Sequence, residues 1–224
     1  MRVRRLIPVA LAAGAALYLR GVYRYRDPVR LPKVGAGEVL SAADGVVGFV
    51  RRVQDCRTDG LDMPALLGTP GAADGWLIGV TVGPLDVHYV FQPVSGAVSY
   101  ATHVGARVNV PLLDAAGTLS ALTGRAVDAL VSRGALENER QAAVISTPAG
   151  DVTVTLVAGR AGLNGTSFTR EGDEVRAGYK AAFLQEGGLV LLHVPLAFTP
   201  AVSVGDRVTG AETVVARSGA GVNA

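Results

Sequence analysis

The chain has 224 residues, enough for one domain with a full hydrophobic core, or for such a domain and a short anchor. Its 29 glycines and its low aromatic content favour short strands joined by tight turns over a helical bundle. We therefore expect a mainly β (α+β) fold with a few short helices. The one cysteine, Cys56, excludes an internal disulfide, and the three histidines are too far apart in sequence for a metal-ligand motif, so no metal is expected.

The net charge of +2 conceals a strong asymmetry along the chain. Residues 1–30 contain seven arginines against the one acid Asp27, a local charge of +6, so the remaining residues together carry −4. A basic N-terminus on a mildly acidic body is typical of attachment to a membrane surface. It argues against general nucleic-acid binding.

Residues Leu6–Leu19 form an uncharged run that is interrupted only by Pro8 and Gly14 and flanked by arginines. A straight transmembrane helix needs about 20 apolar residues, so this run is short unless the residues after it extend it. The pattern predicts an apolar helix that attaches the chain to a membrane, either across the bilayer or along its interface. A cleavable signal peptide is the alternative interpretation.

The first part of the body is predicted to contain strands and one long surface loop. Asp44-Gly45 lies inside the apolar stretch Val39–Val47 and predicts a turn between two strands; by itself the pair is typical of a plain hairpin. Residues 53–75 are rich in turn residues and predict a surface loop with one helical turn near Pro64–Leu67. Trp76–Val82 is predicted to be the next strand.

His88 is the first candidate for a functional side chain. In a strand, Asp86 and His88 would share one face, because side chains two residues apart point the same way. A lone histidine in a strand is usually structural, so a structural and a functional interpretation both remain open here.

The second half of the body begins with Ala/Leu-rich helical stretches over Leu119–Val131, which we expect to end at Gly134. Asn138-Glu139-Arg140 follows and is interpreted, taken alone, as a capping and ion-pair cluster before a hairpin. The hairpin strands are Ala143–Thr147 and Asp151–Gly159.

Gly187-Gly188 forms a tight pair before the apolar run Leu189–Leu192, which predicts a buried strand. On either side of this region, Gly172-Asp173 and Gly205-Asp206 share a Gly-Asp-x-Val core. This weak internal repeat resembles the strand-turn units of barrel-sandwich modules of the biotinyl or lipoyl type.

Five of these blocks, in this order, resemble the phosphatidylserine decarboxylases over about residues 23–217. They are Tyr25–Pro32, Ser41–Gly45, Gly83–Gly96, Asn138–Arg140 with the hairpin that ends in Val-Ala-Gly, and Gly178–Pro195. The resemblance implies that family's fold and its reaction, which converts phosphatidylserine to phosphatidylethanolamine and CO2. It also implies a pyruvoyl group made by self-cleavage at a serine, with Asp44 in the self-cleavage group and His88 associated with decarboxylation.

Three departures from the family pattern bear on activity. The pyruvoyl-forming serine is replaced by Gly188, which lies ten residues after Gly178 and seven before Pro195, as the family spacing requires. A basic family position is Phe91, and a family proline is Ala42. Because glycine has no hydroxyl to attack the preceding carbonyl and no β-oxygen to eliminate, no pyruvoyl group is expected between Gly187 and Gly188.

No other residue supplies the missing carbonyl. The chain contains no Gly-Ser pair, Gly165-Thr166 lacks the apolar strand that should follow, and the only lysines, Lys33 and Lys180, lie in no cofactor motif. Because the family-like sequence begins directly after the apolar run, we predict a retained membrane anchor over residues 1–26 and a phosphatidylserine decarboxylase-like domain over residues 27–224.

Three functional hypotheses follow. The first is a homologue at the cell membrane, with its domain on the cytoplasmic side, that does not process itself and binds a phosphatidylserine-like aminophospholipid, with oligomers possible. The second is an active decarboxylase. The third is a barrel-sandwich adaptor or carrier, although the turn at Asp206-Arg207 has no lysine for attachment of a carried group.

Overall fold

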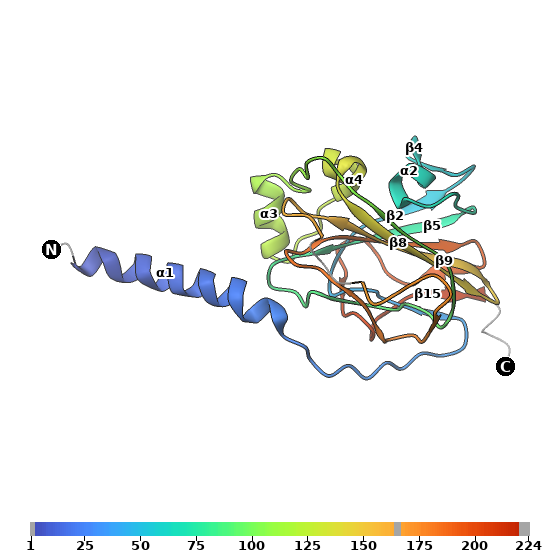
Figure 1. Ribbon diagram of the computed structural model, residues 1–224, viewed down its shortest axis with the longest axis horizontal. Coiled ribbons are helices and arrows are strands. Elements are labelled where there is room, and N and C mark those ends of the chain that lie inside the picture. Colours follow the sequence, from blue (N-terminus) through green and yellow to red (C-terminus); the bar gives the residue numbers. More distant parts are fainter. Residues whose placement is uncertain (1–2, 164–166, 220–224) are drawn as a thin grey trace.

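The computed structural model describes residues 3–163 and 167–219, in which a β body carries one projecting helix (Figure 1). This helix, α1 (Val3–Gly21), contains the apolar run and is followed by a 3-10 turn, η1 (Tyr23–Tyr25), and an extended segment along the body. In the described part of the chain, no helix combines the length and the apolar character that crossing a membrane requires. The Gly165-Thr166 pair, which the sequence does not support as a cleavage site, lies outside the described residues.

The body is mainly β, as predicted, and its largest unit is an antiparallel sheet of eight strands. In spatial order the strands are β10 (Glu174–Val175), β7 (Gly96–Val104), β8 (Arg140–Thr147), β9 (Gly150–Ala158), β12 (Gly188–Pro195), β5 (Gly75–Val82), β2 (Gly45–Val53) and β14 (Arg207–Val208). Three smaller sheets accompany it: β1 (Glu38–Leu40), β15 (Val214–Ser218) and β13 (Phe198–Pro200); β11 (Lys180–Phe183) and β6 (Tyr89–Phe91); and β3 (Arg57–Thr58) and β4 (Leu61–Asp62).

Strand β12 is buried on both of its faces. Val190 and Leu192 point into a core shared with the smaller sheets, whereas Leu189 and Leu191 point into a second core beneath the short helices. A strand buried on both sides needs apolar side chains at successive positions, not at alternate ones. The uninterrupted apolar run at 189–192 therefore predicted this strand correctly.

The helical prediction for Leu119–Val131 is wrong in its boundaries. The structure has three short helices here: α3 (Ala115–Leu122), the 3-10 helix η2 (Ala129–Val131) and α4 (Arg133–Glu137). Gly124 adopts a φ of +73° just after α3, a conformation that ends a helix. Two later side chains each cap a new helix, Asp128 at the backbone N–H of Leu130 and Ser132 at that of Ala135, so Gly134 lies inside α4 instead of ending a helix.

The predicted helical turn near Pro64–Leu67 is confirmed as α2 (Met63–Leu67), which Asp62 caps through the backbone N–H of Ala65. The predicted hairpin after residue 140 is confirmed as β8 and β9. The Asp44-Gly45 turn, however, is not a hairpin. Strand β1 pairs with β15, while β2 pairs with β5 and β14, so the turn carries the chain from one sheet to another.

The two copies of the weak internal repeat form the same kind of turn, one at each edge of the large sheet. Asp173 accepts a hydrogen bond from the backbone N–H of Arg170, and Asp206 accepts one from Ser203, both at 2.8 Å. Each turn leads into a two-residue strand, β10 or β14, and these are the two edge strands of the eight-stranded order. Such short edge strands leave little unpaired backbone for another chain to join.

Candidate functional site

The blocks that resemble a known family meet at one end of the large sheet. Strand β2 begins at Gly45, β5 ends at Val82, β12 begins at Gly188, and β9 ends at Ala158. Neighbouring strands run in opposite directions, so the start of one lies beside the end of the next. The register makes this direct, because Gly188 pairs with Val82 on one side and with Ala158 on the other.

Gly187 and Gly188 are enclosed by main-chain carbonyls. Gly187 has a φ of +76°, and a Cβ atom on it would lie 2.4 Å from the carbonyl oxygen of Val82. A Cβ atom on Gly188 would lie 2.5 Å from the carbonyl oxygen of Val157. Because both distances are below ordinary contact, the backbone found here accommodates glycine and would have to shift for any other residue.

Asp44 is held by an arginine that the sequence did not connect with it. Arg30 donates from one terminal nitrogen to both carboxylate oxygens of Asp44, at 2.7 and 2.8 Å, and the backbone N–H of Gly210 donates to the same carboxylate at 2.8 Å. The Arg30 guanidinium also lies 5.9 Å from the ring centre of Phe91. The positive charge near Asp44 thus comes from Arg30 in the extended segment after η1, whereas Phe91 contributes only an aromatic ring.

The sequence gives only a weak indication of a role for Arg30. Arg30 lies in the family-like block Tyr25–Pro32, but no feature of that block indicates a partner for it. Spacing alone could not reveal the pair, since Arg30 and Asp44 are 14 residues apart in the sequence.

His88 is buried, with 3% of its surface exposed, and is tied to one residue by two hydrogen bonds. Its Nδ1 lies 2.9 Å from the carbonyl oxygen of Leu184, and its own carbonyl accepts from the backbone N–H of Leu184 at 2.9 Å. Nδ1 must carry the proton to donate to a carbonyl, which leaves Nε2 as an acceptor. Nε2 is buried and has no partner of hydrogen-bond geometry among the described residues, although the main chain of Gly83, like that of Leu184, acts on the ring to raise its pKa. Burial lowers the pKa of His88, although its main-chain hydrogen bonds oppose that effect, so the ring is neutral near pH 7.

The expectation that Asp86 and His88 share a strand face is wrong. Residues 83–88 form a turn before β6, closed by the Asp86 carboxylate, which accepts from the backbone N–H of Gly83 at 2.8 Å. The other carboxylate oxygen of Asp86 accepts from Arg207 at 2.5 Å. An aspartate that bonds a backbone N–H three residues before it favours a turn over a strand, and this local bond overrides the alternation. No hydrogen bond within the described ranges joins His88 to either Asp86 or Asp44.

An aromatic group covers His88 on the side of the N-terminal segment. Phe183 lies 6.2 Å from the His88 ring and 5.0 Å from the Tyr89 ring, centre to centre. Tyr25, from η1, stacks on Phe183 at 5.4 Å with the two planes 9° apart. The end of the apolar helix is therefore joined directly to the histidine site.

The role predicted for Asn138-Glu139-Arg140 from its residues alone, capping and ion pairing, is found in part, because the described bonds of Arg140 go to carbonyls and not to Glu139. The side chain of Asn138 donates to the carbonyls of Val110 and Ala158, at 2.7 and 2.8 Å. Glu139 Oε1 lies 2.7 Å from His103 Nε2, within hydrogen-bond distance. The cluster fixes the end of β9 beside Gly188, so it supports the site without touching it.

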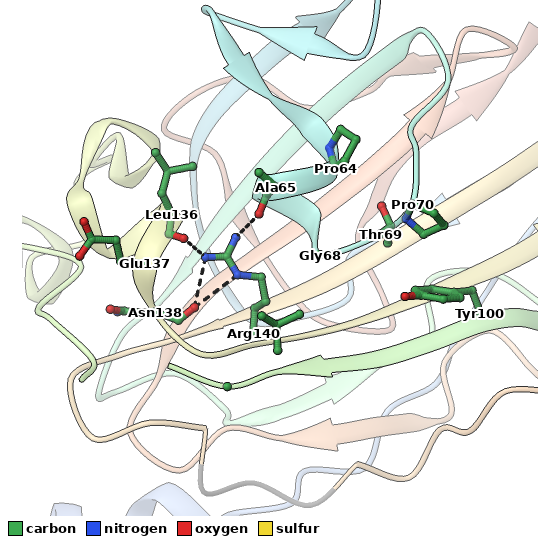
Figure 2. Close-up of a pocket in the computed structure, with 12 residues that line it drawn as sticks. Pro64, Ala65, Gly68, Thr69, Pro70, Tyr100, Leu136, Glu137, Asn138 and Arg140 are labelled. Atoms are coloured by element: carbon green, nitrogen blue, oxygen red, sulfur yellow. Dashed lines mark hydrogen bonds between the residues drawn. The ribbon is translucent and has the colours of Figure 1, made fainter. Parts of the chain in front are cut away.

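Arg140 forms the wall of a cavity of about 410 Å³ between α2 and α4 (Figure 2). Its buried guanidinium donates to the carbonyls of Ala65 and Leu66 at the end of α2, at 2.6 and 2.7 Å, and to those of Leu136 and Asn138. Carbonyls at helix C-termini carry partial negative charge and favour a cation. Burial lowers the pKa of Arg140. Because its donors are directed at these carbonyls, we interpret Arg140 as a structural link between two helices.

The fold and the site together define a β domain in which a glycine pair lies at the start of the buried strand β12, at one end of the large sheet. The family model for phosphatidylserine decarboxylase matches residues 17–216 of the chain. The protein therefore belongs to the phosphatidylserine decarboxylase family.

Curated relatives agree with that assignment. A phosphatidylserine decarboxylase proenzyme of Erythrobacter litoralis is 29% identical over 198 residues, which is 87% of this chain and 72% of the relative. A proenzyme of the same description from Granulibacter bethesdensis is 30% identical over 204 residues, covering 91% of this chain and 72% of the relative. One from Polynucleobacter asymbioticus is 29% identical, covering 86% of this chain and 75% of the relative.

Proposed function

We propose that this protein is a family member that does not cleave itself and that binds an aminophospholipid at the His88 site. The observation that carries the proposal is Gly188. Self-cleavage needs a hydroxyl on this residue to attack the carbonyl of Gly187, and glycine has none. The residues present therefore do not fit a pyruvoyl group, the carbonyl that supplies the electron sink for loss of CO2 in this family.

The groups that would assist self-cleavage are also altered or engaged. Phe91 stands at the position that is basic in the family and cannot accept or donate a proton. The Asp44 carboxylate is neutralised by Arg30 and the backbone N–H of Gly210. Both of its oxygens already accept hydrogen bonds, so Asp44 would have to give up these donors to orient a nucleophile.

Binding of an amine remains compatible with the site. The unpartnered Nε2 of His88 is a buried acceptor, and an unmet buried acceptor costs about 1–3 kcal/mol. A protonated primary amine has three N–H donors and satisfies such an acceptor well. The ammonium group of an aminophospholipid is therefore complementary to His88, without any reaction following.

The membrane is the source of such a ligand. Of the described side chains of α1, Ile7, Leu11, Leu17 and Tyr18 are exposed, and an exposed apolar helix next to arginines favours the membrane interface. The N-terminal segment continues from α1 to the Tyr25–Phe183 stack above His88. We infer attachment to the cell membrane, with the β domain on the cytoplasmic side.

Intact-mass spectrometry of the purified full-length protein tests the proposal most directly. We expect one species at the full-chain mass of 22.9 kDa. Two fragments divided between Gly187 and Gly188, the second with a blocked N-terminus, would exclude a non-processing protein.

The alternative is an active decarboxylase, favoured by the presence of Asp44 and His88 at their family positions. It requires a carbonyl from a source other than residue 188. Hydroxylamine or borohydride would inactivate a protein that depends on such a carbonyl, and CO2 release from phosphatidylserine would measure that activity. We expect no CO2 release before or after treatment.

A further inference from the structure

Helix α3 presents its larger apolar side chains to solvent and its small ones to the body. Leu119 and Leu122 are 64% and 44% exposed, and with the exposed Ala115 they form one face, because helix residues three, four and seven apart lie on the same side. We call these three residues the α3 stripe. The opposite face is partly buried, and a Cβ atom on its Gly117 would lie 3.5 Å from Cγ1 of Val127. The helix is therefore amphipathic in the reverse sense, with leucines directed away from the core.

The α3 stripe lies at the end of the body that contains His88. Figure 1 shows α3 at the end of the body from which α1 projects. Just after α3, Gly124 lies beside Arg207, whose Nη1 would be 3.7 Å from a Cβ atom on that glycine. Arg207 in turn donates to Asp86 in the turn before His88, and the neighbouring Leu85 is 42% exposed. A surface that contacts α3 would therefore lie beside the turn that leads to His88.

Positive charge accompanies the exposed leucines. Arg125 follows α3, is exposed, and pairs with no acid among the residues that the structure describes. Asp114, at the other end of α3, directs its carboxylate to the backbone N–H of Gly117 at 2.6 Å. Exposed leucines beside a free arginine are complementary to a surface with anionic headgroups above an apolar interior.

The small size of the α3 stripe favours a membrane over a protein partner. A stable protein–protein interface buries about 1,000 Å² or more, which a pair of leucines and their neighbours do not supply. A membrane contact has no such minimum area, because each inserted side chain adds to the affinity that another anchor already provides.

We propose that the α3 stripe and Leu85 form a second membrane contact, which enters the headgroup region of an anionic bilayer and holds the His88 end of the body against it. The inference rests on the attachment through α1 proposed above. It adds an orientation to that attachment: α1 supplies most of the affinity, and α3 determines which end of the body faces the lipid.

An environment-sensitive fluorophore on single cysteines of the full-length protein tests this orientation. Cys56, the chain's own cysteine, is exposed and follows the end of β2 farthest from Gly45, so a probe on it is the matched control. The second probe is attached to Leu122→Cys in a Cys56→Ser background. With vesicles of equimolar phosphatidylcholine and phosphatidylserine, we expect a blue shift and quenching by brominated lipid at position 122, and neither at Cys56.

Substitutions measure how much the leucines contribute. Leu119→Gln/Leu122→Gln keeps good helix formers at both positions. It should lower the vesicle partition coefficient of the full-length protein about tenfold, because two half-inserted leucines together contribute about 1.4 kcal/mol. Leu196→Gln is the matched control, since Leu196 is 47% exposed but follows the opposite end of β12 from Gly188. It should bind as the wild type does.

Arg125→Gln tests the contribution of charge. Binding to the mixed vesicles should fall about fivefold, because one basic residue near an anionic surface contributes about 1 kcal/mol. Binding to vesicles of phosphatidylcholine alone should not change.

Three results would overturn the inference. A probe at position 122 that stays in water while the protein floats with the vesicles would exclude the α3 contact and leave the attachment through α1 intact. A shift of the same probe with protein concentration, in the absence of lipid, would show that the α3 stripe joins two copies of the chain. If the wild-type protein does not float with the mixed vesicles, the attachment through α1 fails together with this inference.

Discussion

The carbonyl oxygens of Val82 and Val157 lie close to Gly187 and Gly188, one carbonyl to each glycine. At the scale of single residues, Gly188 therefore differs from a serine by more than a hydroxyl group. The surrounding backbone has the geometry of a glycine pair in an unbroken strand. A serine at position 188 would carry its hydroxyl group on a Cβ atom that is crowded by the carbonyl oxygen of Val157.

The substitution Gly188→Ser tests this point, with Gly188→Ala as its matched control. Both variants add a Cβ that lies 2.5 Å from the Val157 oxygen, so both should lower the free energy of unfolding by about 1–3 kcal/mol in urea titrations. Because Phe91 supplies no base, we expect both to remain single chains by intact mass. Cleavage of the serine variant but not the alanine variant would show that the remaining groups are sufficient for self-processing.

At the scale of elements, α1 and the segment after it differ in how they meet the body. The described side chains of α1 are largely exposed, whereas the segment from Arg24 to Arg30 contributes a ring stack, two arginine-to-carbonyl bonds and the Asp44 ion pair. The helix should therefore contribute little to the free energy of unfolding, and the segment should contribute more.

Deleting residues 1–22 should change the free energy of unfolding by less than about 0.5 kcal/mol, as expected for the removal of exposed groups. The same deletion should abolish flotation with vesicles that contain phosphatidylserine, because the apolar helix is lost. Deleting residues 1–26 should cost about 1 kcal/mol more, since it also removes the Tyr25–Phe183 stack. Full vesicle binding by the shorter deletion would contradict the role of α1 as an anchor.

At the scale of the whole molecule, the body contains two buried histidines, His193 in the large sheet and His88 in the turn before β6. His193, at 2% exposure, lies on β12 with its Nε2 2.9 Å from the carbonyl oxygen of Ala73. Burial lowers the pKa of His193, as it lowers that of His88. The unfolded chain therefore takes up protons at these residues before the folded chain does.

This difference gives stability a defined pH dependence. Stability from the two histidines is present above the unfolded pKa of about 6.5 and declines as the pH falls below it, because protons then favour the unfolded state. We expect the Tm to be nearly constant from about pH 7 to 8 and to fall between about pH 6.5 and 5, before most carboxylates titrate. His193→Gln keeps an amide donor for Ala73 and should flatten this decline in thermal scans. An unchanged slope in His193→Gln would contradict burial of a neutral histidine.

The sequence by itself predicted the features that depend on neighbouring residues. It indicated the mainly β class, the buried strand at 189–192, the hairpin of β8 and β9, and the helical turn near Pro64–Leu67. It also suggested the repeated Gly-Asp turns, whereas the assignment of residue 188 to a family serine position stays a prediction. Each of these rests on periodicity, turn chemistry or spacing within one segment, which local backbone preferences determine.

Only the tertiary structure decided which distant segments meet. It pairs Arg30 with Asp44, and it places β1 and β2 in different sheets. It also directs the Asp86 carboxylate to the backbone N–H of Gly83 in a turn, so that Asp86 and His88 share no strand face. It also brought Arg24 and Arg26 to the two loops around His88. These pairings depend on burial and on hydrogen bonds between residues far apart in the chain. The local sequence does not indicate such distant partners, because the free energy that favours these contacts comes from the assembled core.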